Sequence, residues 1–286
     1  MVQTATAGGL EAAQKIIIAS SRYTEEHNAP AISLIESFNL AKGEKSMTVP
    51  KVGQMTIADL TDGQDIVDEE DIGMTNVSLT AAEVGAKIIL TDKLIRQSAE
   101  NVYSLVGRQL GDGMARKKDN DVTALYSGFS TDIGAAGRSM SLANVSASVA
   151  YAKGNKFGSQ VYINHHPFAV WDVANTAVTA SSTYPVPKGW SEDLLGDFFS
   201  GLRPLNGVPI FEDGNISIDS SDDAIGVIAD KSALAVLKSV DTRTERQRDA
   251  SLRATELVMT ADYGVFELDD SKGAALTLDA GTPATS

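Results

Sequence analysis

The sequence contains no cysteine, so neither a disulfide nor a thiolate metal site can form within it. It also contains no run that approaches the roughly 18 apolar residues of a membrane-spanning helix, and we expect no membrane association. The N-terminal stretch lacks a basic leader followed by a long apolar core, since its run Ile16–Ile18 is too short for one. We therefore expect a protein that is made and kept in the cytoplasm.

The sequence also lacks the local signatures of catalysis. It has no Walker sequence and no G-x-S-x-G, and the spacing of Gly107, Gly111 and Gly113 does not fit a G-x-G-x-x-G phosphate loop. These glycines fall inside a helical pattern rather than after a strand. We expect no catalytic residue and no cofactor, and we interpret the chain as a non-enzyme.

The sequence also lacks a residue pattern that is typical of a metal site. His165 and His166 are adjacent at the end of a predicted strand, so they point to opposite faces and cannot share a metal. Asp213, Asn215 and Ser217 begin like a calcium loop. However, isoleucine and alanine stand where that loop requires glycine and a bidentate glutamate. No metal site is predicted.

Acidic residues outnumber basic residues, and the formal net charge is −14. Such a surface should repel a nucleic-acid backbone rather than grip it. The charge is unevenly spread, because Val52–Ala86 holds eight acidic residues and no lysine or arginine. Two basic clusters oppose it, the first made of Arg116, Lys117 and Lys118, and the second of Arg243, Arg246, Arg248 and Arg253.

What the sequence does contain is a strand that passes directly into a long helix within Met74–Gly128. Apolar residues alternate up to Leu90 and then recur at three- and four-residue steps from Ile95 to Met114. No proline occurs between Pro50 and Pro167 to break this helix. A helix over Asp92–Tyr126 would be about 50 Å long at 1.5 Å per residue.

Residues 46–90 predict a long β-hairpin, with Met74–Leu90 as its second limb. An isolated two-stranded hairpin is only marginally stable, so we expect a neighbouring molecule to support the strands. Its tip is crowded with acids, and either a neighbour holds them or they form a solvated loop. The acidic candidates for contact between subunits are Asp62, Asp65, Asp68, Glu69, Glu70 and Asp71. The basic candidates are Arg116, Lys117, Lys118, Arg243, Arg246 and Arg248.

Residues 1–45 are interpreted as an arm that docks on another subunit, the alternative being a helical pair folded on its own domain. The middle of the chain alternates strands and helices, which predicts a mixed α/β or α+β lobe. The predicted strands are around Val161–Ile163, Val208–Phe211, Ala224–Ala229, Glu256–Met259, Val265–Leu268 and Ala274–Leu278. Helices are expected at Leu142–Lys153, after Pro167 and at Lys231–Lys238, with 240–253 as an arginine-rich connection.

The order of these elements, with the phrases KSMTVPKVGQ, KKDNDVTALYSG, QVYINHHPFAVWDV and GVPIFEDGN, resembles the major capsid protein of tailed double-stranded DNA bacteriophages. The resemblance covers nearly the whole chain and implies an α+β fold of the Hong Kong 97 type. It implies an N-terminal arm at 1–45 and an extended loop at 46–90. A peripheral domain with a spine helix would take 91–135 and 240–286, and an axial domain 136–240.

In function, the resemblance implies a virion protein that self-assembles through hexamers and pentamers into an icosahedral shell around double-stranded DNA. Portal and scaffolding proteins are the partners it implies. Because Val52–Ala86 has no lysine, the covalent crosslink that some members form through this loop is not expected, and a cement protein could take its place. No leading scaffolding segment is expected either. The alternatives are an encapsulin shell that encloses enzymes, and a two-lobed α/β enzyme or binding protein.

Overall fold

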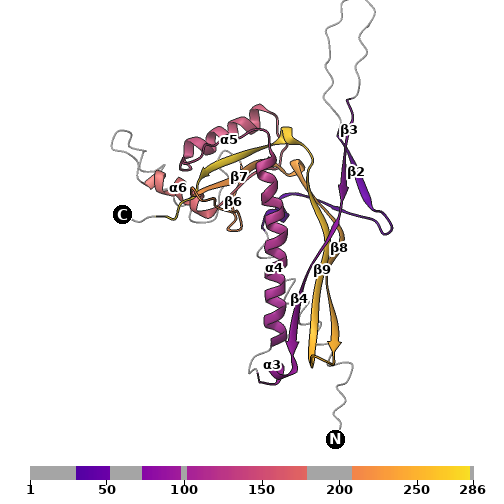
Figure 1. Cartoon of the computed structure of the whole chain (residues 1–286). Helices are drawn as coiled ribbons and strands as arrows, with labels where there is room; N and C mark the ends of the chain where they lie inside the picture. Colours follow the sequence, from indigo (N-terminus) through magenta and orange to yellow (C-terminus); the bar gives the residue numbers. More distant parts are fainter. Residues whose placement is uncertain (1–29, 52–72, 98–101, 179–207, 284–286) are drawn as a thin grey trace, which may run out of the picture.

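Two four-stranded β-sheets and one long helix organise the chain, and a two-stranded hairpin stands apart from them (Figure 1). The computed structural model describes residues 30–51, 73–97, 102–178 and 208–283. The helices, including 3-10 turns, are α2 (Pro30–Leu34), α3 (Asp92–Gln97), α4 (Val102–Ala124), η1 (Leu125–Gly128), α5 (Leu142–Gly154), α6 (Pro167–Val178), η2 (Lys231–Ala233) and η3 (Asp270–Lys272). The strands are β1 (Glu36–Asn39), β2 (Ser46–Lys51), β3 (Thr75–Thr80), β4 (Ala82–Thr91), β5 (Val161–His165), β6 (Ile210–Glu212), β7 (Asp223–Asp230), β8 (Leu234–Asp249), β9 (Ala254–Glu267) and β10 (Gly273–Asp279).

The first sheet has the order β1-β8-β9-β4 and forms an elongated limb. Strand β9 pairs antiparallel with both neighbours, and its residues alternate between buried and half-buried along most of its length. This alternation gives the strand one face for a core. The register of β4 against β9 is unbroken from Ala82 opposite Tyr263 to Thr91 opposite Ala254.

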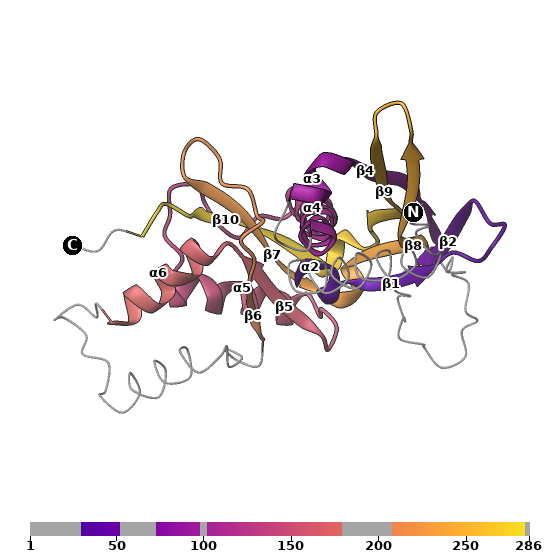
Figure 2. The same cartoon turned by 90° about the horizontal axis from the view of Figure 1, so that it is seen from below.

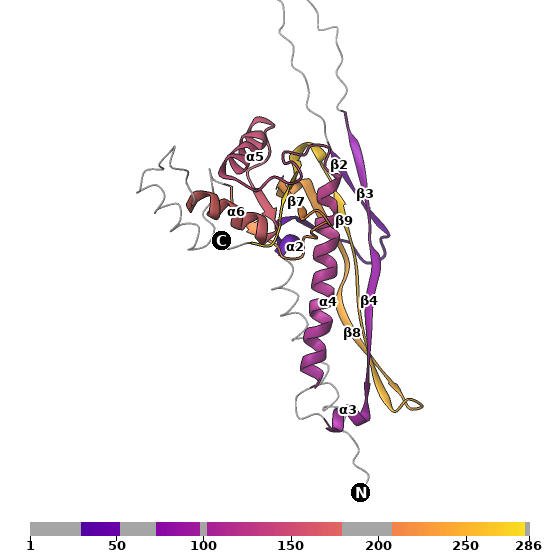
Figure 3. The ribbon, with the colours of Figure 1, turned by 60° about the vertical axis from the view of Figure 1, so that its left-hand side comes forward.

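Helix α4 runs along this sheet (Figure 3). Its buried face carries Val106, Leu110, Met114 and Val122 at helical spacing. The predicted continuous helix from Asp92 is only partly confirmed, because the described elements are a short α3, α4 and the 3-10 turn η1. Helix α4 alone has 23 residues and is therefore about 35 Å long, and its three glycines do not interrupt it.

The second sheet has the order β10-β7-β5-β6 and forms a lobe at one end of the limb. Its central strand β7 is almost wholly buried, as expected for a strand with neighbours on both sides. The predicted helices at Leu142–Lys153 and after Pro167 are confirmed as α5 and α6. The predicted strands within this lobe are confirmed to within a few residues as β5, β6, β7 and β10.

One prediction in the following segment is wrong and another is incomplete. Lys231–Lys238 is not a helix, because only the 3-10 turn η2 precedes the long strand β8. The segment 240–253 is not only an arginine-rich connection, since β8 continues to Asp249 and a short turn leads into β9. The four buried residues that open β8 lie between β1 and β9, and this pairing on both sides overrides the helical preference of alanine and leucine.

The hairpin is shorter than predicted. Strands β2 and β3 pair antiparallel from Ser46 opposite Thr80 to Lys51 opposite Thr75. Beyond Thr80 the predicted second limb leaves the hairpin and becomes β4 of the limb sheet. The acidic tip of the hairpin, like most of the predicted arm, lies outside the described residues.

Viewed from below, the lobe with α5, α6 and β5 to β7 extends sideways from the axis of α4 (Figure 2). Strand β10 comes from the C-terminal end of the chain and pairs with β7 in this lobe. The segment 240–286, which the sequence interpretation kept together, therefore contributes strands to both sheets. Loop residues Asp132 and Ser139 bridge to β10 and draw the segment after η1 onto the same sheet.

Candidate assembly surfaces

The hairpin β2–β3 is a sheet of its own, and little of the described chain covers it. Within it Leu79 is buried, while most of the other side chains are exposed or half-buried. Lys51 Nζ binds Asp269 Oδ1 at 2.5 Å and so ties the tip-side end of the paired strands to the N-cap of η3. Gly264 of β9 allows a second close approach, because a Cβ there would lie 2.4 Å from the Thr80 carbonyl oxygen.

The first basic cluster lies on successive positions of α4. Arg116 and Lys117 pair with acids one turn away, Asp112 at 2.8 Å and Asp121 at 2.6 Å. Both cations stay more than half exposed, and exposed pairs of this kind contribute little to stability. Both remain accessible to a partner molecule.

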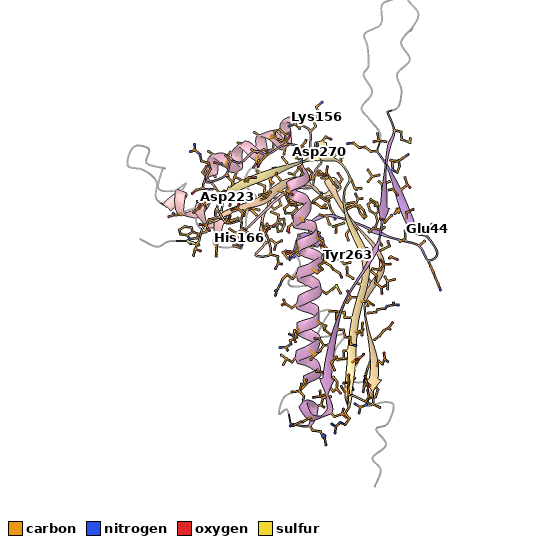
Figure 4. The ribbon with its side chains drawn as sticks, in the orientation of Figure 1. Glu44, Lys156, His166, Asp223, Tyr263 and Asp270 are labelled. Atoms are coloured by element: carbon orange, nitrogen blue, oxygen red, sulfur yellow. The ribbon has the colours of Figure 1, made fainter. Side chains whose placement is uncertain are left out.

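Lys118, the third member, is directed toward the sheet instead. Its Nζ lies 3.0 Å from Thr242 Oγ1 and 5.7 Å from the centre of the Tyr263 ring. Tyr263 lies beside α4 where helix and sheet meet (Figure 4), and its hydroxyl donates to Asp121 Oδ2 at 2.7 Å. Lys118 therefore joins helix to sheet within one molecule.

The second basic cluster lies along β8 and in the turn after it, and Arg243 and Arg248 have side-chain contacts in their own chain. Arg248 forms a two-pronged pair with Asp92 at 2.6 and 2.7 Å, which fastens α3 to the end of β8. The hydrogen bond from Arg248 lowers the pKa of Asp92. Arg243 donates to Thr260 Oγ1 at 3.1 Å, and Arg246 is half-buried on the same strand. The contact of Lys118 with Thr242 brings the two basic clusters together at one point along β8.

Large exposed apolar side chains gather at the free end of the limb. Leu94 on α3 and Leu252 in the β8–β9 turn are 49% and 56% exposed. The two segments are joined by a hydrogen bond of 3.0 Å from the Asp92 amide to the Arg253 carbonyl. Among the described residues, the other large apolar side chains that are exposed are Met74, Ile89, Leu105 and Val240.

A groove of about 1090 Å³ lies where limb and lobe meet. Its lining includes Ile32 and Glu36 from the segment α2–β1, and Lys118, Asp230 and Lys238 from the body. The lining is mixed in charge and polarity. Among the described residues, no group of three histidines and acids could hold a metal there or elsewhere.

The residues that resembled a calcium loop have another role. Asp213 is buried, its Oδ1 accepts the Asn215 amide at 2.9 Å, and the Asn215 side chain donates to Asp119 Oδ2 at 2.8 Å. Burial raises the pKa of Asp119 to about 7, with the facing Asp213 carboxyl as the next cause. No sequence motif indicated that Asp119 and Asp213 meet, because they are far apart in the chain.

His165 and His166 both lie in the interior of the lobe. His165 is fully buried, its Nε2 lies 3.0 Å from the Leu276 carbonyl oxygen, and its Nδ1 accepts the His166 amide at 2.9 Å. Burial lowers the pKa of His165 to about 4, so this ring is neutral at physiological pH. His166 lies within the lobe (Figure 4). Its ring meets the Phe168 ring edge-on, with the ring centres 4.7 Å apart.

The basic candidates from the sequence are thus placed on α4 and β8, while the acidic candidates, Asp62 to Asp71, lie outside the described residues. Contact between the two sets stays a prediction. No helix in the described part of the chain is long and apolar enough to cross a membrane.

No protein-family model matches this sequence, and no curated protein matches it either. Solved structures do. The capsid of a native GTA particle superposes with a TM-score of 0.67 at 12% identity, over 87% of this chain and 90% of the other. The mature capsid of bacteriophage PhiM1 gives 0.64 at 15%, over 88% and 87%. A structure from Mycobacterium phage Che8 gives 0.66 at 15%, over 82% and 84%. The chain therefore has the α+β fold of phage capsid proteins, as its order of elements predicted.

Proposed function

We propose that this chain is a major capsid protein of a tailed bacteriophage, a structural protein and not an enzyme. It assembles with copies of itself, through hexamers and pentamers, into an icosahedral shell that encloses double-stranded DNA. The observation that carries the proposal is the shared fold, which extends over most of this chain and of each capsid chain it matches. Portal, scaffolding and cement proteins are the further partners proposed.

The proposed division of labour follows the order of the chain. Residues 1–45 act as an arm, 46–90 as an extended loop, 91–135 with 240–286 as a peripheral domain, and 136–240 as an axial domain. The axial domain meets its copies around the hexamer and pentamer axes. Strand β10, which pairs with β7, would then link the C-terminal end of the peripheral domain to the axial one.

The hairpin supports a role in assembly, because it needs contacts with neighbouring subunits to be stable. Its two strands form a separate sheet, and Lys51, the buried Leu79 and the close approach at Gly264 fasten it to the body. A neighbouring subunit would supply the surface that the hairpin lacks. Each contact is weak, but closure of a shell multiplies it over many copies.

The net negative charge is also compatible with a shell that encloses DNA. A formal net charge of −14 disfavours tight binding of the DNA backbone, so packed DNA would not adhere to the shell lining. We propose no sequence-specific DNA contact.

The direct test is to express the full chain and examine it by sedimentation and electron microscopy. Rings, shells or tubes far larger than a dimer are expected. A monomer or small oligomer under all assembly conditions, including added scaffolding protein, would contradict the proposal. Nucleic-acid content of native particles separates a phage capsid from an encapsulin, which would carry a cargo enzyme and no DNA.

Within the shell, we propose that the acidic tip of one subunit meets a basic cluster of the next. Reversal of Asp68, Glu69 and Glu70 to lysine should weaken assembly, most strongly at low salt, where opposite charges attract over a longer distance. Shell yield against ionic strength measures this.

The matched control is a charge swap, in which Arg116→Asp and Lys117→Asp are added to the reversed chain. Recovery of shells identifies the α4 cluster as the acceptor, whereas failure to recover redirects the contact to the arginines of β8. Normal shells from the first variant at every salt concentration would rule out the contact.

A further inference from the structure

Two aspartates meet in the interior where the long helix joins the lobe. Asp119 lies on α4 and is fully buried, and Asp213 lies just after β6 and is 1% exposed. Nothing in the assembly role proposed above requires a buried pair of carboxyl groups. Ionisable groups of one sign are costly to bury together, so this pair calls for a physical explanation.

The hydrogen bonds of Asp119 connect three parts of the fold. Its Oδ1 accepts the amide of Ala31 in α2 at 3.0 Å, and its Oδ2 accepts the side-chain amide of Asn215 at 2.8 Å. Asp213 Oδ1 accepts the Asn215 amide, and the Asp213 amide donates to the His165 carbonyl oxygen at 3.0 Å. The turn after β6 is thus held both to α4 and to the end of β5.

One oxygen in this network is left over. Asp213 Oδ2 is buried and finds no hydrogen-bond partner among the described residues. Asn215 brings the two carboxyl groups together, since its main-chain amide donates to Asp213 Oδ1 and its side-chain amide donates to Asp119 Oδ2. Two ionised carboxylates can only accept, so neither can satisfy the other. One proton placed between them supplies the missing donor and removes the repulsion.

We propose that Asp119 and Asp213 share one proton and that this proton locks the 213–216 turn of the lobe onto α4. Loss of the proton leaves two negative charges in contact within a buried site, and the turn then separates more readily from the helix. The pair therefore acts as a pH-sensitive joint between the lobe and the limb.

Among the described residues, the main groups that shift the pKa of Asp119 include no lysine or arginine that would stabilise a second charge. The described titratable groups that interact with the pair are His166, just after β5, and Tyr126 of η1. Burial lowers the pKa of His166, so this ring is neutral at and above pH 7. Helix α2 contributes only the Ala31 amide. Because the pKa of Asp119 is raised to about 7, the proton is released near neutrality.

The joint has a second polar connection that does not depend on pH in this range. Asn164 Nδ2 of β5 donates to the hydroxyl of Tyr126 at 2.9 Å, and the burial of Tyr126 raises its pKa well above 10. This neutral bond spans the same junction and provides a matched comparison for the carboxyl pair.

The direction of the pH effect follows from the different proton affinities of the closed and the open joint. The closed joint binds the proton with a pKa of about 7, whereas a solvated aspartate releases it near pH 4. Opening therefore releases a proton between these two values, and the open fraction rises by up to about tenfold per pH unit. Below about pH 4 and above about pH 7 the open fraction stays level.

The test is hydrogen exchange of the full-length chain between pH 5 and pH 8, followed by mass spectrometry and corrected for the intrinsic exchange rate. Protection of the Asp213 and Asn215 amides should fall as the pH rises to about 7 and then level off. The Ala275 amide, bonded to the Thr131 carbonyl elsewhere in the lobe, should show no such slope.

Two variants separate the joint from general stability. Asp213→Asn places an amide donor against Asp119 permanently, so its protection should be nearly constant with pH. Tyr126→Phe removes the neutral bond, so it should lower protection equally at every pH and keep the slope.

The inference would be overturned if amide protection in the wild-type chain did not change with pH. It would also be overturned if protection in Asp213→Asn fell with pH as steeply as in the wild type. The experiment reads a single chain and does not require assembly. If the slope is absent while shells form normally, the joint is refuted and the capsid role stands. If the slope is present but no shells form, the joint is supported and the capsid role is refuted.

Discussion

At the scale of single residues, one very close contact is at Gly226 in the central strand β7. A Cβ at this position would lie 2.1 Å from Cδ2 of the buried His165 ring and 2.6 Å from the Asn164 carbonyl oxygen. Neither neighbour is a flexible side-chain end, so Gly226→Ala must shift the strand or the ring. We expect a destabilisation of about 1–3 kcal/mol or more, measured by denaturant unfolding of the unassembled chain.

A glycine on α4 provides the matched control. Gly113 is exposed within the helix, and a Cβ there would meet nothing within 4 Å. Gly113→Ala should therefore leave stability unchanged or raise it by up to about 1 kcal/mol, because alanine favours the helix. If Gly226→Ala unfolds at the same denaturant concentration as wild type, the packing of His165 against β7 is not as described.

At the scale of elements, the hairpin β2–β3 depends on a small number of attachments to the body. Lys51→Met removes its ion pair with Asp269, a carboxyl that is largely shielded from solvent. We expect faster hydrogen exchange in β2 and β3, by up to about fivefold, since such pairs contribute at most about 1 kcal/mol. The difference should shrink at high salt.

Lys45, one residue before β2, is exposed and serves as the comparison for this change. Lys45→Met alters the net charge equally, and exchange in the hairpin should stay at the wild-type rate. Equal acceleration by both substitutions would show that net charge, rather than the pair with Asp269, governs the hairpin.

Elements with a clear period were predictable from sequence. The alternation that ends at Leu90 and the helical spacing from Val102 to Met114 identified β4 and α4, because each element buries one face of regular spacing. The opening of β8 had no such period. It is buried on both faces, and a short run rich in alanine and leucine fits a helix as well as a central strand. Only its partners in space decide between them.

The candidate sites show the same limit. The basic clusters were visible as runs in the sequence, but the sequence did not show that Arg248 pairs with Asp92 or that Lys118 contacts Thr242. The pair of Asp119 with Asp213 was missed altogether. It depends on the lobe closing against α4, a contact over a long sequence separation that no local pattern encodes.

At the scale of the whole molecule, the free end of the limb exposes large apolar side chains among the described residues. Leu252, in the β8–β9 turn, is more than half exposed and lies in the segment that is hydrogen-bonded to α3. Exposed apolar groups of this kind are typical of contact surfaces. If the chain forms a shell as proposed, Leu252→Asp should reduce assembly while it changes the unfolding free energy by less than about 0.5 kcal/mol.

A substitution at the neighbouring Ala250 is the control for Leu252→Asp. Ala250→Asp adds the same charge to the same exposed turn without the loss of a large apolar side chain, so it should assemble nearly as well as wild type. Sedimentation and electron microscopy of both variants measure the yield of shells. Full assembly of Leu252→Asp would exclude this end of the limb as a contact. Equal failure of both variants would instead mean that added charge, rather than a lost apolar contact, controls the interface at this turn.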